Sequence, residues 1–450
     1  WNYILNQGTL AGLTAIFNKT IFWEENIMLK KWKKASALLM VSLASVFALT
    51  SCGGGAQSGS NTAKKADGKT ITVSVDEGYV DYIKSIKDKF EKDNKVKVNV
   101  KKAAMLDTLD KLSTDGPTGK APDVLMAPYD RVGALGSEGQ IAEVKLNNDK
   151  DYDDTAKKLV TLKGKIYGAP WVIETLVAYY NKDLVPEAPK TFADLEKLNK
   201  DPKFAFPSEA GKGVGFLANW TNLYFGYGLI AGYGGYVFGK NGTDPKDIGI
   251  GNNGAVEGLK YVKSWYDMWP KGMQDVKKAG DFIGEQFNKK KAAVIIDGPW
   301  AAANYKKAGI NYGAAEIPTL PNGKKYQAFA GGKAWVVSNY SKSKAVAQKF
   351  IDYLTQTENQ KLFYDKTQEV PAGLSGRDYA VSKGNELTKA VISQFKNDQP
   401  MPNISEMADV WEPAGNMFFN VASGKKDADK AAAEAMKAVK ETLEQKYGNK

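Results

Sequence analysis

Residues 71–75 read ITVSV, residues 82–90 read YIKSIKDKF and residues 96–100 read VKVNV. The first and third stretches alternate apolar and polar residues as a β-strand does, whereas apolar residues recur in the second at the spacing of an amphipathic helix. A strand, a helix and a strand in this order predict a β-α-β unit. The body of the chain is therefore expected to begin as an α/β fold.

The same rhythm continues along the chain. Residues 106–112 place leucines on one helix face, and residues 122–126, PDVLM, are typical of a buried strand. Residues 171–180, WVIETLVAYY, form a β-type run long enough to cross between lobes. Further helices are expected at 191–198, 223–238, 255–269, 345–354 and 431–443, and strands at 292–296, 312–317 and 334–338. A body of this length favours two lobes, one interrupted in sequence by the other.

A separate stretch near the N-terminus predicts where the chain is located. Lysines at positions 30, 31, 33 and 34 precede an apolar run at 35–49, which is too short to span a bilayer as a stable helix. The run ends in LTSC, which resembles the lipobox of bacterial lipoproteins, and Cys52 is the only cysteine in the chain. These features predict an export signal with a lipidated cysteine. The alternative is a short transmembrane anchor that ends in cysteine by chance.

This interpretation divides the N-terminal region into three parts. Residues 1–27 are expected to be a leader that takes no part in the fold, and residues 28–51 a lipoprotein signal peptide. Residues 52–69 would then be the lipidated Cys52 and a flexible Gly/Ser-rich tether. The protein is expected on the extracytoplasmic face of the cell membrane.

The charge balance argues against a nucleic-acid partner. The chain has 62 Lys and Arg against 51 Asp and Glu, a net charge of +11, of which residues 1–52 supply +3 through five lysines and two glutamates. The remaining lysines are spread along expected helix faces and are not gathered in one patch with aromatic residues. We expect them to form solvated surface.

Missing residue types exclude several kinds of chemistry. The chain has no histidine, so a His-based triad or His-ligated metal is impossible, and Cys52 is assigned to the lipid. Residues 149–153, DKDYD, imitate the start of a calcium loop, but Asp154 stands where glycine is needed and Val160 where glutamate is needed. We expect no metal and no cofactor. Glycosidases that use two carboxylates stay possible.

Two acidic positions are candidates for ligand binding. Asp130 and Arg131 directly follow a predicted strand, at the end where open α/β sheets bind ligands. Glu174 interrupts an apolar β-run, where a carboxylate must be hydrogen-bonded or face a cavity because an unpaired buried charge costs several kcal/mol. A structural ion pair is the alternative for each.

Aromatic residues supply a third indication. Tyr224, Tyr227, Trp300 and Trp411 are flat apolar rings with a polar tip, suited to lie on the C–H faces of a pyranose. Taken singly, a ring of this kind more often belongs to the core. Trp300 and Trp411 flank turns, where complete burial of an indole is harder.

The body from about residue 70 resembles the maltose/maltodextrin-binding proteins of ABC importers, within the extracellular solute-binding family. The matching stretches are FEKD at 90–93, YDR at 129–131, YNKDL at 180–184, LIA at 229–231, GGY at 234–236, DGPW at 297–300, and MPNI at 401–404 through Trp411. The resemblance implies a periplasmic-binding-protein-like α/β fold: two lobes joined by three crossing segments near Glu174, Ala330 and Val370, with a ligand cleft between them. Residues 70–174 plus 331–371 would form the N-terminal lobe, and residues 175–330 plus 372–450 the C-terminal lobe.

The resemblance also implies roles for residues of this chain. The expected sugar-binding set is Asp76, Glu77, Asp130, Arg131, Glu174, Tyr224, Trp300, Met401 and Trp411. In it Asp130, Arg131 and Glu174 would bind hydroxyl groups, the three aromatic rings would stack on sugar, and Met401 would line the cleft wall.

Three departures from the family pattern bear on specificity. Ala127 stands where the family often has a tryptophan, Asn222 where it has a glutamate and Gly415 where it has an arginine. Our hypothesis is a longer or differently seated oligosaccharide than maltose, with Tyr129 or Tyr227 compensating for the missing ring.

The implied function is a lipid-anchored monomeric receptor that captures malto-oligosaccharides and delivers them to ABC transporter permease subunits without breaking a bond. One alternative is a secreted glycosidase that uses Glu174 and Asp130. For that role Arg131 is expected to be harmful, because its charge would keep Asp130 ionised. Another alternative is an adhesin or structural surface protein, which would bind no small sugar saturably.

Replacing Cys52 by Ser should release the protein from the membrane or leave its precursor unprocessed, since no thiol remains to be acylated. Immunoblots of membrane and soluble fractions measure this, with Ser58→Ala in the tether as the matched control. Full membrane retention of Cys52→Ser would contradict the lipid anchor.

Overall fold

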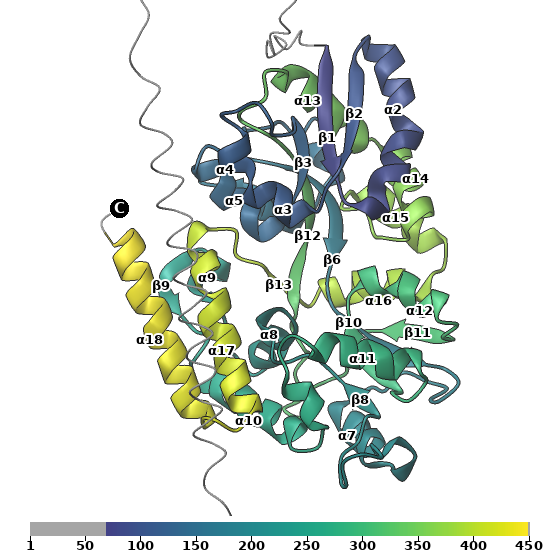
Figure 1. The fold of residues 1–450 in the computed structure, drawn as a ribbon, viewed down its shortest axis with the longest axis vertical. Coiled ribbons are helices and arrows are strands. Elements are labelled where there is room, and N and C mark those ends of the chain that lie inside the picture. Colours follow the sequence, from purple (N-terminus) through teal and green to yellow (C-terminus); the bar gives the residue numbers. More distant parts are fainter. Residues whose placement is uncertain (1–68, 449–450) are drawn as a thin grey trace, which may run out of the picture. The chain divides into compact units, whose positions relative to one another are not determined.

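The structure, a computed structural model, describes residues 69–448 of the chain (Figure 1). They belong to one compact unit spanning Lys65–Lys450. The predicted leader, the signal peptide, Cys52 and all but the last residue of the tether lie outside the described residues. None of the described helices is both long and apolar enough to cross a membrane.

One six-stranded sheet contains the predicted β-α-β unit. Its order is β13-β12-β3-β1-β2, with β6 also paired to β12. The strands are β1 (Thr70–Val75), β2 (Lys97–Lys102), β3 (Val124–Pro128), β6 (Ala169–Glu174), β12 (Phe329–Val337) and β13 (Gln399–Pro400). β1 pairs in parallel with β2 and β3, and α2 (Val80–Asn94) lies between β1 and β2 in sequence, which confirms the unit.

The faces of this sheet are buried in two separate cores. Val124 and Met126 of β3 belong to one core, and the alternate residues Leu125 and Ala127 to the other. A strand covered on both faces explains why residues 122–126 read as a continuous apolar run. The first core also holds Trp171 and Trp335 beside α2, α13 (Lys344–Leu354) and α14 (Thr357–Thr367).

A second sheet has four strands in the order β11-β7-β10-β8. Its strands are β7 (Val177–Asn181), β8 (Phe216–Leu217), β10 (Val294–Asp297) and β11 (Tyr312–Ala315). Around it lie α7 (Phe192–Lys200), α8 (Leu223–Gly232), α10 (Asn253–Tyr266), α11 (Ala279–Asn288), α12 (Ala302–Lys307), α16 (Glu386–Phe395), α17 (Trp411–Ala422) and α18 (Ala428–Tyr447). Its core contains Trp220, Trp265 and Trp269, all at most 1% exposed.

Shorter elements complete the described chain. They are η1 (Glu77–Tyr79), α3 (Met105–Asp110), α4 (Leu112–Asp115), α5 (Tyr129–Ser137), η2 (Asp149–Asp151), α6 (Asp154–Leu159), β4 (Thr161–Leu162), β5 (Lys165–Ile166), η3 (Pro202–Phe204), α9 (Gly239–Gly242), β9 (Asp244–Ile248), η4 (Lys271–Gln274), η5 (Pro299–Ala301), α15 (Leu374–Ser382) and η6 (Ser405–Asp409). The helix predicted at 106–112 is two helices, α3 and α4, that meet at Lys111.

The long β-type run at 171–180 passes from one sheet to the other. It is not one strand: β6 ends at Glu174 in the first sheet, and β7 begins at Val177 in the second. β12 pairs with β6 along one side, while the Ile173 amide donates to the Val370 carbonyl and Ala372 donates to Trp171 on the other. The three segments named from the resemblance therefore lie side by side (Figure 1).

A buried carboxylate fixes the link between β6 and β7. The Thr175 hydroxyl donates to Asp398, and the Gln394 amide donates to the other Asp398 oxygen at 2.7 Å. Thr175 is 0% and Asp398 is 9% exposed. Burial raises the pKa of Asp398 to about 7, although both hydrogen bonds lower it.

This raised pKa predicts a pH-dependent stability. The folded state binds the Asp398 proton more tightly than the unfolded chain, so its contribution is complete below about pH 4 and is lost as the pH rises through about 7. Asp398→Asn cannot ionise. Between about pH 5 and pH 8 the wild type should lose stability through this group, whereas the variant should not. The decrease in the free energy of unfolding should therefore be about 2 to 3 kcal/mol smaller in Asp398→Asn than in the wild type.

Urea unfolding at the two pH values measures this difference. Asp378→Asn, at an exposed position of α15, is the matched control and should follow the wild type. Equal pH dependence in Asp398→Asn and the wild type would contradict the assignment of this effect to the raised pKa of Asp398.

Candidate functional site

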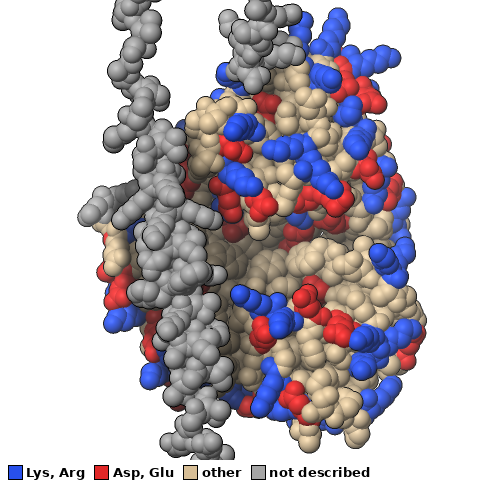
Figure 2. All heavy atoms as spheres, viewed as in Figure 1, with Lys and Arg blue, Asp and Glu red and all other residues tan. Residues whose placement is uncertain are grey.

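A cavity of about 780 Å³ lies between α5 and the segment from η6 to Trp411. Its lining includes Asp110, Asp130, Arg131, Trp411 and Tyr447. The cavity thus brings together three of the predicted site residues from two regions of the sequence. Figure 2 shows a hollow across this face of the molecule, with basic and acidic side chains interspersed around it.

Asp130 and Arg131 do not pair with each other as their adjacency suggested. The Arg131 guanidinium donates to Asp110 of α3 at 2.9 Å. Burial raises the pKa of Asp130 to about 6, and the Arg131 charge opposes this only in part. The expectation that Arg131 keeps the pKa of Asp130 low is therefore wrong, because desolvation of the carboxylate outweighs that charge.

Glu174 belongs to a buried cluster around an ammonium group. Lys333 of β12 donates to Glu174, to the Tyr79 hydroxyl at 3.0 Å and to Glu369 at 3.4 Å. Tyr79 donates in turn to Glu369 at 2.9 Å. Burial by itself would lower the pKa of Lys333, but the two carboxylates raise it well above its ordinary value.

Burial and the neighbouring Glu369 raise the pKa of Glu174, and Lys333 lowers it. Burial is the largest of these causes. Glu174 is 7% exposed and ion-paired with Lys333, so the structure shows the structural ion pair that the sequence left open as the alternative to a cavity-facing carboxylate.

Three predicted aromatic residues form a row. The Trp300 and Tyr224 ring centroids are 6.0 Å apart, Tyr224 lies 6.3 Å from Phe329, and Phe329 lies 6.0 Å from Trp411. Trp300 is 42% exposed, and Tyr224 and Trp411 are partly buried. Burial raises the pKa of Tyr224 and the Glu174 charge adds to the shift. Phe329 of the row and Lys333 of the cluster both belong to β12.

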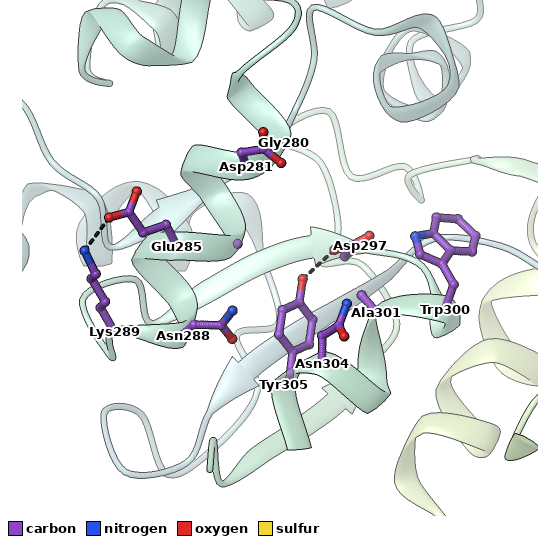
Figure 3. A pocket seen from close by; sticks show the side chains of 11 residues that line it. Gly280, Asp281, Glu285, Asn288, Lys289, Asp297, Trp300, Ala301, Asn304 and Tyr305 are labelled. Carbon is purple, nitrogen blue, oxygen red and sulfur yellow. Dashed lines mark hydrogen bonds and ion pairs between the residues drawn. The ribbon is translucent and has the colours of Figure 1, made fainter. Parts of the chain in front are cut away.

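Trp300 also lines a second cavity, of about 580 Å³, among α11, β10 and α12. Figure 3 shows Trp300 at one end of its lining, with Glu285 directed at Lys289 and Tyr305 at Asp297. Burial raises the pKa of Asp297, although the Tyr305 hydroxyl lowers it. The polar side chains that line this cavity carry carboxylate, amide, hydroxyl, indole and ammonium groups, the last from Lys289.

The other predicted residues have mixed surroundings. Met401 is 7% exposed, lines a third cavity of about 1020 Å³, and packs near Gly331. Asp76 accepts a hydrogen bond from the Met105 amide at 2.7 Å, and burial raises its pKa. Glu77 is exposed and pairs with Lys102 at 3.0 Å. Glu77 therefore forms a surface ion pair, and Asp76 holds the first residue of α3.

The hypothesis that Tyr129 or Tyr227 replaces a missing stacking ring is wrong. Tyr129 is 1% exposed, and Tyr227 is 3% exposed and stacked on Phe329 with centroids 3.8 Å apart. Neither ring has a free face. Ala127 is fully buried, and Asn222 caps α8 by accepting from the Tyr224 amide.

The acidic stretch at 149–153 serves the fold. Asp151 accepts from the amide and hydroxyl of Ser375 and from Gln360, and Asp153 caps α6 and pairs with Arg377. Within residues 69–448, no group of three or more His, Cys, Asp or Glu side chains is placed to hold a metal ion.

Sequence reasoning missed Lys333, Glu369 and Tyr79. Lys333 could have been found, because it interrupts an apolar strand just as Glu174 does. Glu369 and Tyr79 carry no such signal, since their roles arise from contacts between segments almost 300 residues apart.

Comparison with known proteins identifies the family. The model of the bacterial extracellular solute-binding proteins matches residues 85–388. The chain therefore belongs to this family.

The chain is similar both to proteins known by sequence and to solved crystal structures. A maltooligosaccharide ABC transporter solute-binding lipoprotein of Streptococcus pneumoniae is 55% identical, covering 94% of this chain and all of its own. The maltodextrin-binding protein MdxE of Bacillus subtilis is 52% identical over 92% of this chain and 99% of its own. The crystal structure of MalX from S. pneumoniae with maltopentaose has a TM-score of 0.81 and 58% identity, covering 83% of this chain and 100% of its own. The maltose-binding protein MalE of Listeria monocytogenes, in complex with maltose, has a TM-score of 0.80 and 60% identity, covering 85% and 100%.

Proposed function

We propose that this protein binds malto-oligosaccharides between its two lobes and delivers them, chemically unchanged, to the permease subunits of an ABC transporter. The observation that carries the proposal is the row of Trp300, Tyr224 and Trp411 beside buried carboxylates. These residues come from distant parts of the sequence, and packing around Phe329 brings them together. The named ligands of the relatives support the same class of sugar.

The chemistry of the row suits a neutral, linear glucan. Pyranose rings present apolar C–H faces to aromatic rings and hydroxyl groups at their rims. Partly exposed Trp300, Tyr224 and Trp411 can take the faces. Asp130, Arg131 and Glu174 can take the hydroxyls through charge-assisted hydrogen bonds, while Met401 and Asp76 line the approaches.

Hinge closure explains how binding is signalled. Periplasmic binding proteins close around their ligands by a hinge motion. A sugar that touches both lobes favours the closed form by the difference between its affinities for the closed and open forms. The permease can then recognise the closed shape. No covalent step is needed.

The lobes in this proposal are residues 70–174 plus 331–371 and residues 175–330 plus 372–450. Because α15 packs on α14 whereas α16 packs on β11, we propose to move the boundary after residue 371 to the start of α16. The protein is proposed to act as a monomer, held at the extracytoplasmic face of the membrane by acyl chains on Cys52.

The glycosidase alternative has one feature in its favour and one against. A general acid needs a raised pKa, which Asp130 has, but the second carboxylate, Glu174, is occupied by Lys333. The relatives are binding proteins. We propose that this chain likewise catalyses no reaction.

The preferred sugar length is tested by calorimetric titration of the protein, without its predicted signal peptide and Cys52, with maltose, maltotriose, maltotetraose and maltopentaose. We expect the tightest binding with a sugar longer than maltose, because Ala127 and Asn222 remove a stacking ring and a charged partner from the position that maltose would use. Tightest binding to maltose would contradict the length, and no saturable binding would contradict the function. Chromatography of the same mixtures should show intact sugars, whereas shortened products would favour the glycosidase.

Trp300→Ala and Trp411→Ala should each weaken maltopentaose binding by about 1 to 3 kcal/mol, through lost stacking area. Val381→Ala, at a residue 43% exposed on α15, is the matched control and should bind as the wild type does. Unchanged binding with a lowered melting temperature would instead assign the indole to structural packing.

A further inference from the structure

One ammonium group joins the three segments that connect the two sheets. Glu174 is the last residue of β6, Lys333 lies in β12, and Glu369 directly precedes the pairing of residues 370–372 with β6. Val172 of β6 is opposite Lys333 on one side and Pro371 on the other. Each crossing segment thus contributes one charged side chain to the same cluster.

The hydrogen-bonding capacity of Lys333 is used within the cluster. An ammonium has three N–H donors, and Glu174, the Tyr79 hydroxyl and Glu369 are three acceptors within reach. The Lys333 side chain is 12% exposed. It therefore has no donor left for a sugar, and any effect on binding must act through Glu174.

The local charges show what this lysine does. The Glu174 and Glu369 side chains are 10% and 13% exposed, and their carboxylates would repel each other without the ammonium between them. Besides Tyr79, which belongs to the cluster, the titratable groups close enough to act on it are Asp76 near η1, Tyr129 on α5 and Tyr224 on α8. None of them supplies a second positive charge.

We infer that Lys333 is a positioning residue for ligand binding: it holds the Glu174 carboxylate in place and ionised by joining it to the other two crossing segments. This inference rests on the proposed function, since it takes Glu174 to be a sugar contact. A ligand that engages Glu174 then acts on a group tied to all three crossings.

The test compares maltopentaose affinity in Lys333→Met, Glu369→Gln and the double variant at about pH 6 and pH 8. Lys333→Met should bind about 10- to 100-fold more weakly than the wild type, as expected when a buried charged hydrogen bond is lost. The loss should be larger at the higher pH, because burial raises the pKa of Glu174 and the variant has no ammonium to stabilise its charged form. Each variant is compared with the wild type at the same pH, because Asp130, with a pKa of about 6, also titrates over this range.

Removing the second carboxylate provides the diagnostic readout. The double variant should regain at least about fivefold over Lys333→Met and depend less on pH, because Glu174 no longer faces a like charge although it is still buried. A lysine that only fills space would show neither effect. Lys84→Met, at an exposed position of α2, is the matched control and should bind as the wild type does.

The outcomes separate the two proposals. If the wild type binds no malto-oligosaccharide, the proposed function fails. If the wild type binds and Lys333→Met binds equally at both pH values, or is not rescued by Glu369→Gln, the positioning role fails. Should Lys333→Met not fold, the double variant is compared with Glu369→Gln alone, and equal affinity of these two would overturn the role of Lys333.

Discussion

The pairing of β6 with β12 is the constraint on which the rest of the structure depends. It places Glu174 opposite Gly331 and Val172 opposite Lys333, so backbone register brings the carboxylate and the ammonium together. Gly332 makes this register possible. Its φ is +137°, and a Cβ there would lie 1.9 Å from the Val172 carbonyl oxygen. A residue with a side chain would push β12 away from β6, and the charge cluster would come apart.

Burial of charge at this junction is costly, and its cost shows in the pKa values. Glu174, Asp130 and Asp398 all have raised pKa values, with burial as the largest cause in each. Such groups weaken the fold unless they are fully hydrogen-bonded. The large apolar cores around Trp171 and Trp265 can offset the cost. Perturbed acids gathered in one region are typical of functional sites, which fits their position where the two sheets meet.

The sequence predicted the parts of this structure that depend on local pattern. Alternation and helical spacing located the β-α-β unit, and an acid within an apolar run located Glu174. Properties set by distant packing were beyond its reach. The break after Glu174 depends on which sheet each half of the run joins. The partner of Arg131 is Asp110 on another helix, and the burial that raises the pKa of Asp130 comes from elements distant in sequence. Tyr129 and Tyr227 resemble the surface aromatic residues in sequence, and only their packing shows that they are core.

The turn that carries Trp300 shows how an exposed ring can be held rigidly. A Cβ on Gly298 would lie 2.1 Å from the indole, so the ring folds over this glycine. The Gly298 amide donates to Asp297, its carbonyl accepts from the Tyr179 hydroxyl at 3.0 Å, and Tyr305 donates to Asp297. The backbone under the indole is therefore fixed from both sides. In the proposed function, a ring ordered before the ligand arrives would lose little conformational entropy on binding, so more of its stacking energy would contribute to affinity. This is a physical reason for a Gly-Pro-Trp turn that follows a buried strand and an aspartate.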